Sequence, residues 1–137
     1  MQFRNYCKWT VLIGTFVIWM IKLAIRPYLH DDFVKFSLDV APNFIGALLV
    51  PFAAYWLYTH EHFFHGRLMR FHFFSDNRLV CLFGFSLAVI NEYLQLVPAF
   101  GRTFDYFDIL FSALGLVLSY YSFLFLQRRM VMSYDRQ

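Results

Sequence analysis

Residues 91–108 read NEYLQLVPAFGRTFDYFD and separate two of the most apolar runs in the chain. Pro98 lacks a backbone N–H and cannot continue a helix, and Gly101 permits a tight turn. The stretch therefore predicts the end of one helix near residue 97, a short turn, and the start of the next helix. The apolar runs on either side then form an antiparallel hairpin, with the polar side chains of the stretch gathered at one end.

The overall composition is that of a membrane protein. Of the 137 residues, 60% are hydrophobic and 15% are charged, and the mean hydropathy is +0.50. Soluble domains have about half apolar and about a quarter charged residues. Because a helix satisfies its own backbone hydrogen bonds in lipid, the composition predicts an all-α protein. At about 20 residues per crossing, the chain has room for one bundle and no second domain.

Four runs of the sequence are long and apolar enough to cross a bilayer. They cover residues 9–25, 42–59, 79–97 and 107–126. The prediction is a polytopic, four-helix transmembrane bundle that occupies residues 1–137 as a single domain. Pro51 lies inside the second run, where its missing N–H is expected to bend the helix.

Basic residues are divided unequally between the two ends of the predicted bundle. Eight of the twelve Lys and Arg residues fall in the first segment, the loop after the second helix and the C-terminal tail. The positive-inside rule then places both termini in the cytoplasm, and the loops over 26–41 and 98–106 face outward. The net charge of +3 comes mostly from this bias and suits anionic lipid headgroups, so no nucleic-acid partner is expected. Cys7 and Cys81 fall near the cytoplasmic face, where thiols stay reduced, and no disulfide is predicted.

Small and polar residues form stripes along three of the predicted helices. Helices in lipid associate through such residues, because these allow close approach and interhelical hydrogen bonds. The stripe on the third helix is Gly84, Ala88, Glu92 and Gln95, and the stripe on the fourth is Asp108, Ser112, Gly115, Ser119 and Ser122. The second helix carries Asn43, Ala47 and Ala54 on a comparable face. We expect the third and fourth stripes to pack against each other.

Glu92 is the one ionisable residue in the stripe of the third predicted helix. A carboxylate inside an apolar helix costs a few kcal/mol unless it is paired, hydrogen-bonded or near water, so we expect Glu92 to point into the bundle. The predicted outer mouth of the bundle also holds Asn43, Gln95 and Asp108, and the following turn supplies a cation, Arg102. These five residues predict one polar, ligand-binding pocket, in which Arg102 pairs with Glu92 or holds an anionic group.

A purely structural interpretation of the same residues also stands. Glu92 and Gln95 can form a buried hydrogen-bond network that only holds helices together. Asp105 can cap the fourth helix through its side chain, and Asp108 complements the helix dipole three positions later. Lys22 is expected to extend toward the outer headgroups.

The polar motif resembles that of a known family. The similarity is to the VanZ-like family of small bacterial membrane proteins, and it rests on Glu92, Gln95 three positions later, a short loop with Gly101 and Arg102, Asp108, and a small-residue helix with Gly115. The resemblance covers residues 90–118. It implies a multi-pass protein of the bacterial cytoplasmic membrane with a role in the cell envelope, in a family associated with resistance to the glycopeptide antibiotic teicoplanin. Family members often carry an Asn and a later Pro-Leu-Gly on an earlier helix, whereas here Asn43 and Pro51 are present without a Gly close behind.

The segment at residues 60–78, HEHFFHGRLMRFHFFSDNR, allows two interpretations. Its imidazoles and a carboxylate have spacings that can converge on a metal ion, namely His60, Glu61, His62, His65 and His72. Alternating Phe, Arg and His instead suits an amphipathic segment in the inner headgroup layer, which we favour. The final SDN is expected to cap the third helix. No metal and no cofactor is predicted.

The favoured function is a binding protein that engages an envelope lipid, a lipid-linked cell-wall intermediate or a glycopeptide through the outward pocket. One alternative is a structural subunit or assembly partner of a larger membrane complex, whose polar stripe only stabilises the bundle. A second alternative is a membrane-embedded enzyme acting on an outer-leaflet lipid, because paired carboxylates can perform acid–base chemistry. The sequence has no serine elbow and no Gly-rich phosphate loop, which favours a binding protein over an enzyme.

Cysteine labelling of spheroplasts tests the predicted topology. A cysteine introduced at Gly101 is expected to react with an impermeant reagent from the outside, and one at Gly66 only after the membrane is opened. The reverse pattern would put the polar pocket on the cytoplasmic side and contradict a role toward an envelope ligand.

Overall fold

The computed structural model describes residues 2–28, 32–59, 76–94 and 105–134, and these residues are almost entirely helical. The elements are α1 (Gln2–Met20), a π-helical turn η1 (Ile21–Ile25), a 3-10 turn η2 (Arg26–Tyr28), α2 (Asp32–Tyr58), α3 (Asn77–Leu94) and α4 (Tyr106–Tyr134). The described parts of the chain contain no strand. The predicted all-α class is confirmed for them.

Three helices extend beyond the apolar runs predicted for them. Helix α1 begins at Gln2, ahead of the predicted start at residue 9. The loop predicted over 26–41 ends early, because α2 begins at Asp32 and carries Pro42 inside the helix rather than at its start. A proline within a helix removes one backbone hydrogen bond, and the acidic first turn at Asp32 favours a helix start there. At the other end of the chain, α4 continues to Tyr134, past the predicted end at residue 126.

Three helical segments are long and apolar enough to cross a membrane: Phe3–Tyr28, Asp32–Tyr58 and Tyr106–Met130. They correspond to the first, second and fourth predicted spans and support a membrane protein. The third predicted span, 79–97, corresponds to α3, whose described part does not reach the same length and apolarity. A fourth crossing therefore stays a prediction, and residues 95–97 lie outside the described part of the chain.

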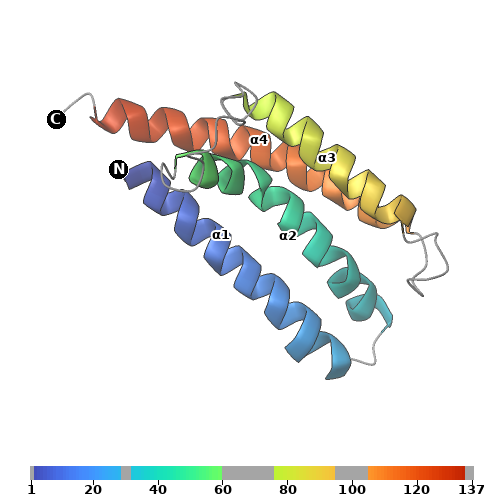
Figure 1. Ribbon diagram of the computed structural model, residues 1–137. Coiled ribbons are helices and arrows are strands. Elements are labelled where there is room, and N and C mark those ends of the chain that lie inside the picture. Colours follow the sequence, from blue (N-terminus) through green and yellow to red (C-terminus); the bar gives the residue numbers. More distant parts are fainter. Residues whose placement is uncertain (1, 29–31, 60–75, 95–104, 135–137) are drawn as a thin grey trace.

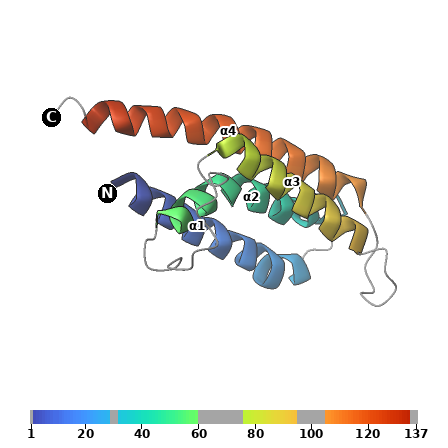
Figure 2. The ribbon, with the colours of Figure 1, turned by 45° about the horizontal axis from the view of Figure 1, so that its top comes forward.

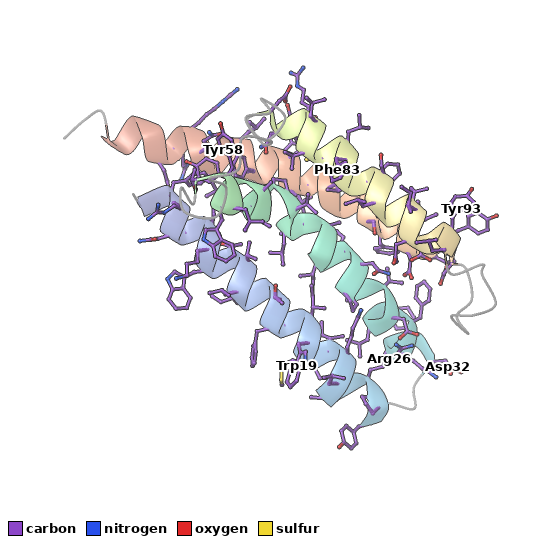
Figure 3. The ribbon with its side chains drawn as sticks, in the orientation of Figure 1. Trp19, Arg26, Asp32, Tyr58, Phe83 and Tyr93 are labelled. Carbon is purple, nitrogen blue, oxygen red and sulfur yellow. The ribbon has the colours of Figure 1, made fainter. Side chains whose placement is uncertain are left out.

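The helices alternate in direction, and the two chain ends lie at the same end of the molecule (Figure 1). Helix α2 occupies the centre, because it packs against α1, α3 and α4, while α3 packs against α4 as well. The rotated view shows α3 alongside α4, with α1 on the other side of α2 (Figure 2). Exposed tyrosines sit at both ends of the helices, as Tyr58 and Tyr93 show (Figure 3). Such residues are typical of the two membrane–water interfaces.

Helices α2 and α4 run in parallel and keep one register along their length. The partners in each contact are 71 residues apart in sequence: Phe36 with Phe107, Phe44 with Gly115, Leu48 with Ser119, and Phe52 with Phe123. The small-residue stripe of α4 thus packs on α2, so the predicted pairing of this stripe with the stripe of α3 is wrong. The sequence pattern identified the buried face of α4 but not the helix that covers it.

The contact between α2 and α4 brings one helix against the backbone of the other. A Cβ atom added at Gly115 would lie 2.5 Å from the carbonyl oxygen of Phe44 and 3.1 Å from the Cβ atom of Ala47. One turn further along α4, the fully buried Ser119 hydroxyl donates a hydrogen bond to the carbonyl oxygen of Leu48. Small residues and an interhelical hydrogen bond therefore join these helices, as is typical of association in lipid.

Aromatic side chains fill the core at the end of the molecule where both termini lie. Phe52 and Phe123 are each 3% exposed, and their ring centroids lie 5.4 Å apart in an edge-to-face arrangement. Phe3 of α1 contacts the ring of Phe123 at 5.4 Å, also edge to face. Such pairs stabilise a fold beyond their area of contact. These rings tie α1 to both α2 and α4, whereas most of the remaining surface of α1 is exposed and apolar.

Replacing Gly115 with Ala is expected to destabilise the protein. The added methyl group would clash with the backbone of α2, and overpacking of this kind costs about 1–3 kcal/mol, which outweighs the ~1 kcal/mol that Ala gains over Gly in a helix. Gly46→Ala is the matched control, because its nearest neighbour would be Cδ1 of Ile18 at 4.0 Å. Thermal unfolding in detergent should show a lower midpoint for Gly115→Ala and an unchanged or higher one for Gly46→Ala. Equal midpoints would contradict the close α2–α4 contact.

Candidate functional site

Glu92 is buried, as expected for a carboxylate in an apolar helix. Its side chain lies in α3 and is 4% exposed, and it ends a line that starts at the buried Val80 and passes through the half-buried Gly84 and Ala88. These residues follow one another at intervals of four, so they share one side of the helix. A Cβ atom added at Gly84 would meet Val50 of α2 at 2.9 Å and Leu116 of α4 at 3.5 Å. The face that carries Glu92 is therefore the face of α3 that packs on its neighbours.

The antiparallel packing of α3 and α4 brings Glu92 and Asp108 to the same level. Gly84 lies opposite Leu116. Glu92 is eight residues further along α3, and Asp108 is eight residues back along α4, so both carboxylates lie two turns from that contact in the same direction. Glu92 is buried and Asp108 is half-buried. Two predicted site residues thus lie at the same level along the bundle.

Asn43, which was predicted at the same level as Asp108, lies further along the bundle. It is half-buried on α2, between the buried Pro42 and Phe44, whose carbonyl oxygen lies against Gly115. In the shared register of α2 and α4, Asn43 is opposite Leu114, about 9 Å further along the helix than Asp108. Along this register, Asn43 belongs to the packed region between α2 and α4.

Several predicted site residues lie outside the described residues. Gln95 and Arg102 are among them, so the pairing of Glu92 with Arg102 stays a prediction. The histidines proposed as alternative metal ligands, in residues 60–72, are also outside. Within the described ranges, no group of three or more His, Cys, Asp or Glu side chains could hold a metal ion.

Two of the predicted helix caps are confirmed. Asp105 precedes α4, and its carboxylate oxygen accepts a hydrogen bond of 2.8 Å from the backbone N–H of Phe107. Asp76 does the same at the start of α3, where it accepts a 2.9 Å bond from the N–H of Arg78. Both caps satisfy backbone donors that have no partner within the helix. Asp105 therefore has a structural role, as the capping interpretation expected.

An ion pair that the sequence did not reveal lies at the same end of the molecule as Glu92. Nε of Arg26 is 2.7 Å from a carboxylate oxygen of Asp39, and it links the turn η2 to helix α2. Arg26 is labelled at this end in Figure 3. The two side chains are 45% and 36% exposed, so the pair contributes modestly to stability. This ion pair was missed because residues 26–41 were predicted to be a loop. In a loop, sequence spacing does not tell which side chains lie close together.

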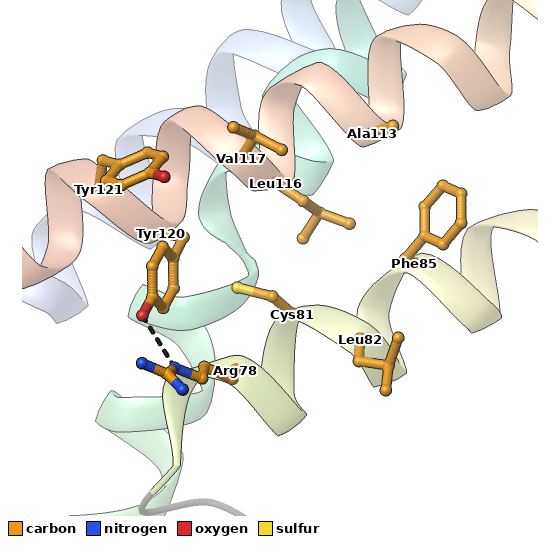
Figure 4. A pocket seen from close by; sticks show the side chains of 9 residues that line it. All are labelled: Arg78, Cys81, Leu82, Phe85, Ala113, Leu116, Val117, Tyr120 and Tyr121. Carbon is orange, nitrogen blue, oxygen red and sulfur yellow. Dashed lines mark hydrogen bonds between the residues drawn. The ribbon is translucent and has the colours of Figure 1, made fainter.

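A groove of about 560 Å³ lies between α3 and α4, nearer the end where the termini lie. Apolar side chains from both helices line most of it, and Arg78 stands at one end (Figure 4). Nε of Arg78 donates a 3.2 Å hydrogen bond to the hydroxyl of Tyr120. This site was not predicted, because in the sequence Arg78 counted only as one basic residue of the inner loop. Its partner, 42 positions away, is set by the packing of the two helices.

A charge reversal at Glu92 is expected to prevent stable folding. Glu92→Lys would bury an ammonium group among the packed faces of three helices, at a cost of about 3–5 kcal/mol. Glu92→Gln keeps the shape and the hydrogen-bonding capacity and should cost far less. Leu94→Lys is the control, because Leu94 is 52% exposed at the end of the same helix. Yield of monodisperse protein and thermal midpoint are the measurements. A Leu94→Lys loss as large as that of Glu92→Lys would contradict the buried position of Glu92.

No family model, no curated protein and no solved structure matches the chain. The function is therefore argued from the residues of the two sites themselves. One site is the buried carboxylate level with Asp108, and the other is the apolar groove with Arg78 at its end.

Proposed function

We propose that the chain is a VanZ-like integral protein of the bacterial cytoplasmic membrane. In this proposal it binds an envelope lipid, a lipid-linked cell-wall intermediate or a glycopeptide through a polar pocket at the outer end of a four-helix bundle. The observation that carries the proposal is the buried carboxylate of Glu92 in an apolar helix.

A buried carboxylate is a functional candidate because it is costly to keep. Ionisable side chains inside membrane helices destabilise the bundle unless they are paired or hydrogen-bonded, and they commonly mark binding or transport sites. Holding α3 in place does not require a carboxylate, since Val80, Gly84 and Ala88 on the same face provide packing. Asp108 adds a second carboxylate at the level of Glu92. This concentration of acceptors favours a ligand with hydrogen-bond donors, such as the hydroxyls and amides of a sugar or peptide headgroup.

The remaining part of the proposed pocket comes from the turn between α3 and α4. Arg102 supplies the cation for a phosphate or carboxylate of the ligand, because a guanidinium binds such groups with two parallel hydrogen bonds. Gln95 and Asn43 add oriented hydrogen bonds. The same residues, with the exception of Asn43, carry the resemblance to the VanZ-like family. The excess of basic residues near the chain ends favours an orientation with this pocket outward.

Binding of a lipid-linked cell-wall intermediate, whose polyprenyl phosphate carries a sugar and peptide headgroup, to the purified protein in lipid nanodiscs tests the proposal. Wild type is expected to bind, and Glu92→Gln and Arg102→Ala should each weaken binding about tenfold or more, because each loses a charge-assisted contact. Ser86→Ala is the matched control on α3, since Ser86 is exposed and its hydroxyl bonds only to the carbonyl of Leu82, at 2.9 Å.

A double-mutant cycle separates a shared pocket from two unrelated effects. If Glu92 and Arg102 interact in one pocket, the double variant should lose less binding free energy than the sum of the two single losses. Strictly additive losses would contradict a pocket in which the two residues interact. Unchanged affinity, with lower abundance and stability of the variants, would instead support a structural subunit whose polar residues only hold the bundle together.

A further inference from the structure

We propose that the groove between α3 and α4 is a specific site for one anionic phospholipid. The lipid phosphate lies at Arg78, and an acyl chain follows the groove along α4. This site is separate from the proposed pocket at Glu92 and lies further toward the end of the helices where both termini are found.

The groove has the shape and lining that a hydrocarbon chain requires. Leu82 and Phe85 of α3 and Leu116 and Val117 of α4 are among its walls, and its volume of about 560 Å³ is within the usual range for small-molecule sites. Leu82 and Val117 are 62% and 57% exposed, so the groove opens sideways. Its α4 wall belongs to a helix that can cross a membrane. In a bilayer, the groove therefore faces acyl chains, and lipid is the occupant within reach.

Apolar lining alone does not select one lipid from another, because every lipid tail is equally apolar. The selecting group is Arg78. Arg78 lies at the level of Tyr120 of α4, to which it is hydrogen-bonded. Tyr120 precedes Arg129 by nine residues, which corresponds to about 13 Å along the helix. The cation of Arg78 therefore lies deeper than the basic residues at the end of α4. A cation at such depth is costly unless an anion accompanies it.

Among the described neighbours of Arg78, Asp76 is close enough for its charge to act on the guanidinium, but it forms no ion pair with it. Nε of Arg78 bonds to the Tyr120 hydroxyl, which is neutral, and Figure 4 shows the two terminal nitrogens directed away from the Tyr120 ring. Asp76 directs its oxygen to the backbone N–H of Arg78, as the cap of α3. Among the residues that the structure describes, no carboxylate is within ion-pair distance of this guanidinium. A phosphate can accept two parallel hydrogen bonds from the terminal nitrogens while Nε stays on Tyr120.

The surrounding charges favour an anionic lipid over a zwitterionic one. This end of the molecule carries further basic residues, namely Arg4, Lys8, Arg128 and Arg129. They repel the ammonium group of a choline or ethanolamine headgroup and attract a net negative one. If the termini are cytoplasmic, the adjacent leaflet is also the one rich in anionic lipid in many membranes.

Native mass spectrometry of purified protein offered equal amounts of phosphatidylglycerol and phosphatidylcholine tests the site. Wild type is expected to retain one phosphatidylglycerol, in about tenfold excess over phosphatidylcholine. Arg78→Gln should abolish this preference. Arg129→Gln is the control, since it removes one charge at the same end from a guanidinium that stacks 4.6 Å above the ring of Phe125. Equal effects of the two variants, or equal retention of both lipids by wild type, would overturn the proposal.

A second variant keeps the test valid if Arg78→Gln folds poorly. Val117→Phe narrows the groove without changing charge and should lower retention of phosphatidylglycerol at least fivefold, while inorganic phosphate should not displace the lipid.

Cross-linking through Cys81, which lies in the groove, tests for a second copy of the chain as the occupant. A Cys81-linked dimer in phosphatidylglycerol nanodiscs would overturn the lipid proposal. Failure of this site would leave the binding of the lipid-linked cell-wall intermediate and its Glu92 dependence unchanged.

Discussion

The close approach of α4 to the backbone of α2 is the contact on which the rest of the structure depends. In lipid there is little hydrophobic gain from joining two apolar helices, so association relies on close packing and hydrogen bonds. Gly115 allows α4 to lie against the carbonyl of Phe44, and Ser119 then donates to the carbonyl of Leu48. Pro51 is fully buried nearby, and α2 changes direction in this part of its length (Figure 1). This contact fixes the parallel register of α2 and α4, and the other two helices pack on the frame that they form.

The position of α3 on this frame gives the molecule two chemically different sites. The helix meets both α2 and α4 at Gly84, whose missing side chain leaves room for Val50 and Leu116. Two turns beyond that contact, Glu92 is buried at the level of Asp108. In the opposite direction the helices leave the groove that ends at Arg78 and Tyr120. One end of the hairpin therefore concentrates acidic side chains, and the other holds a cation beside an apolar groove.

The two sites also differ in how the protein accommodates their charge. Glu92 is surrounded by packed helices, and its burial makes any change of charge expensive. Arg78 stands at the open end of a groove, where a molecule from outside can approach its terminal nitrogens. The Arg26–Asp39 pair is a third arrangement, in which both partners remain partly exposed and the protein supplies both charges itself. Only Arg78 thus combines a cation, an apolar groove and an opening toward the bilayer within the described residues.

The sequence by itself determined the membrane character, the all-helical class, the caps at Asp76 and Asp105, and the buried faces of α3 and α4. These features follow from composition and from spacings of three and four residues, which are local properties of a helix. The tertiary structure alone decided that the α4 stripe meets α2, that Glu92 and Asp108 share a level, and that Arg78 meets Tyr120. Each of these depends on the relative shift of two helices, and several shifts would satisfy the same apolar pattern. The choice among them is made by the few places where a residue without a side chain leaves room for the neighbouring helix, as Gly115 does for the backbone at Phe44 and Gly84 for the side chains of Val50 and Leu116.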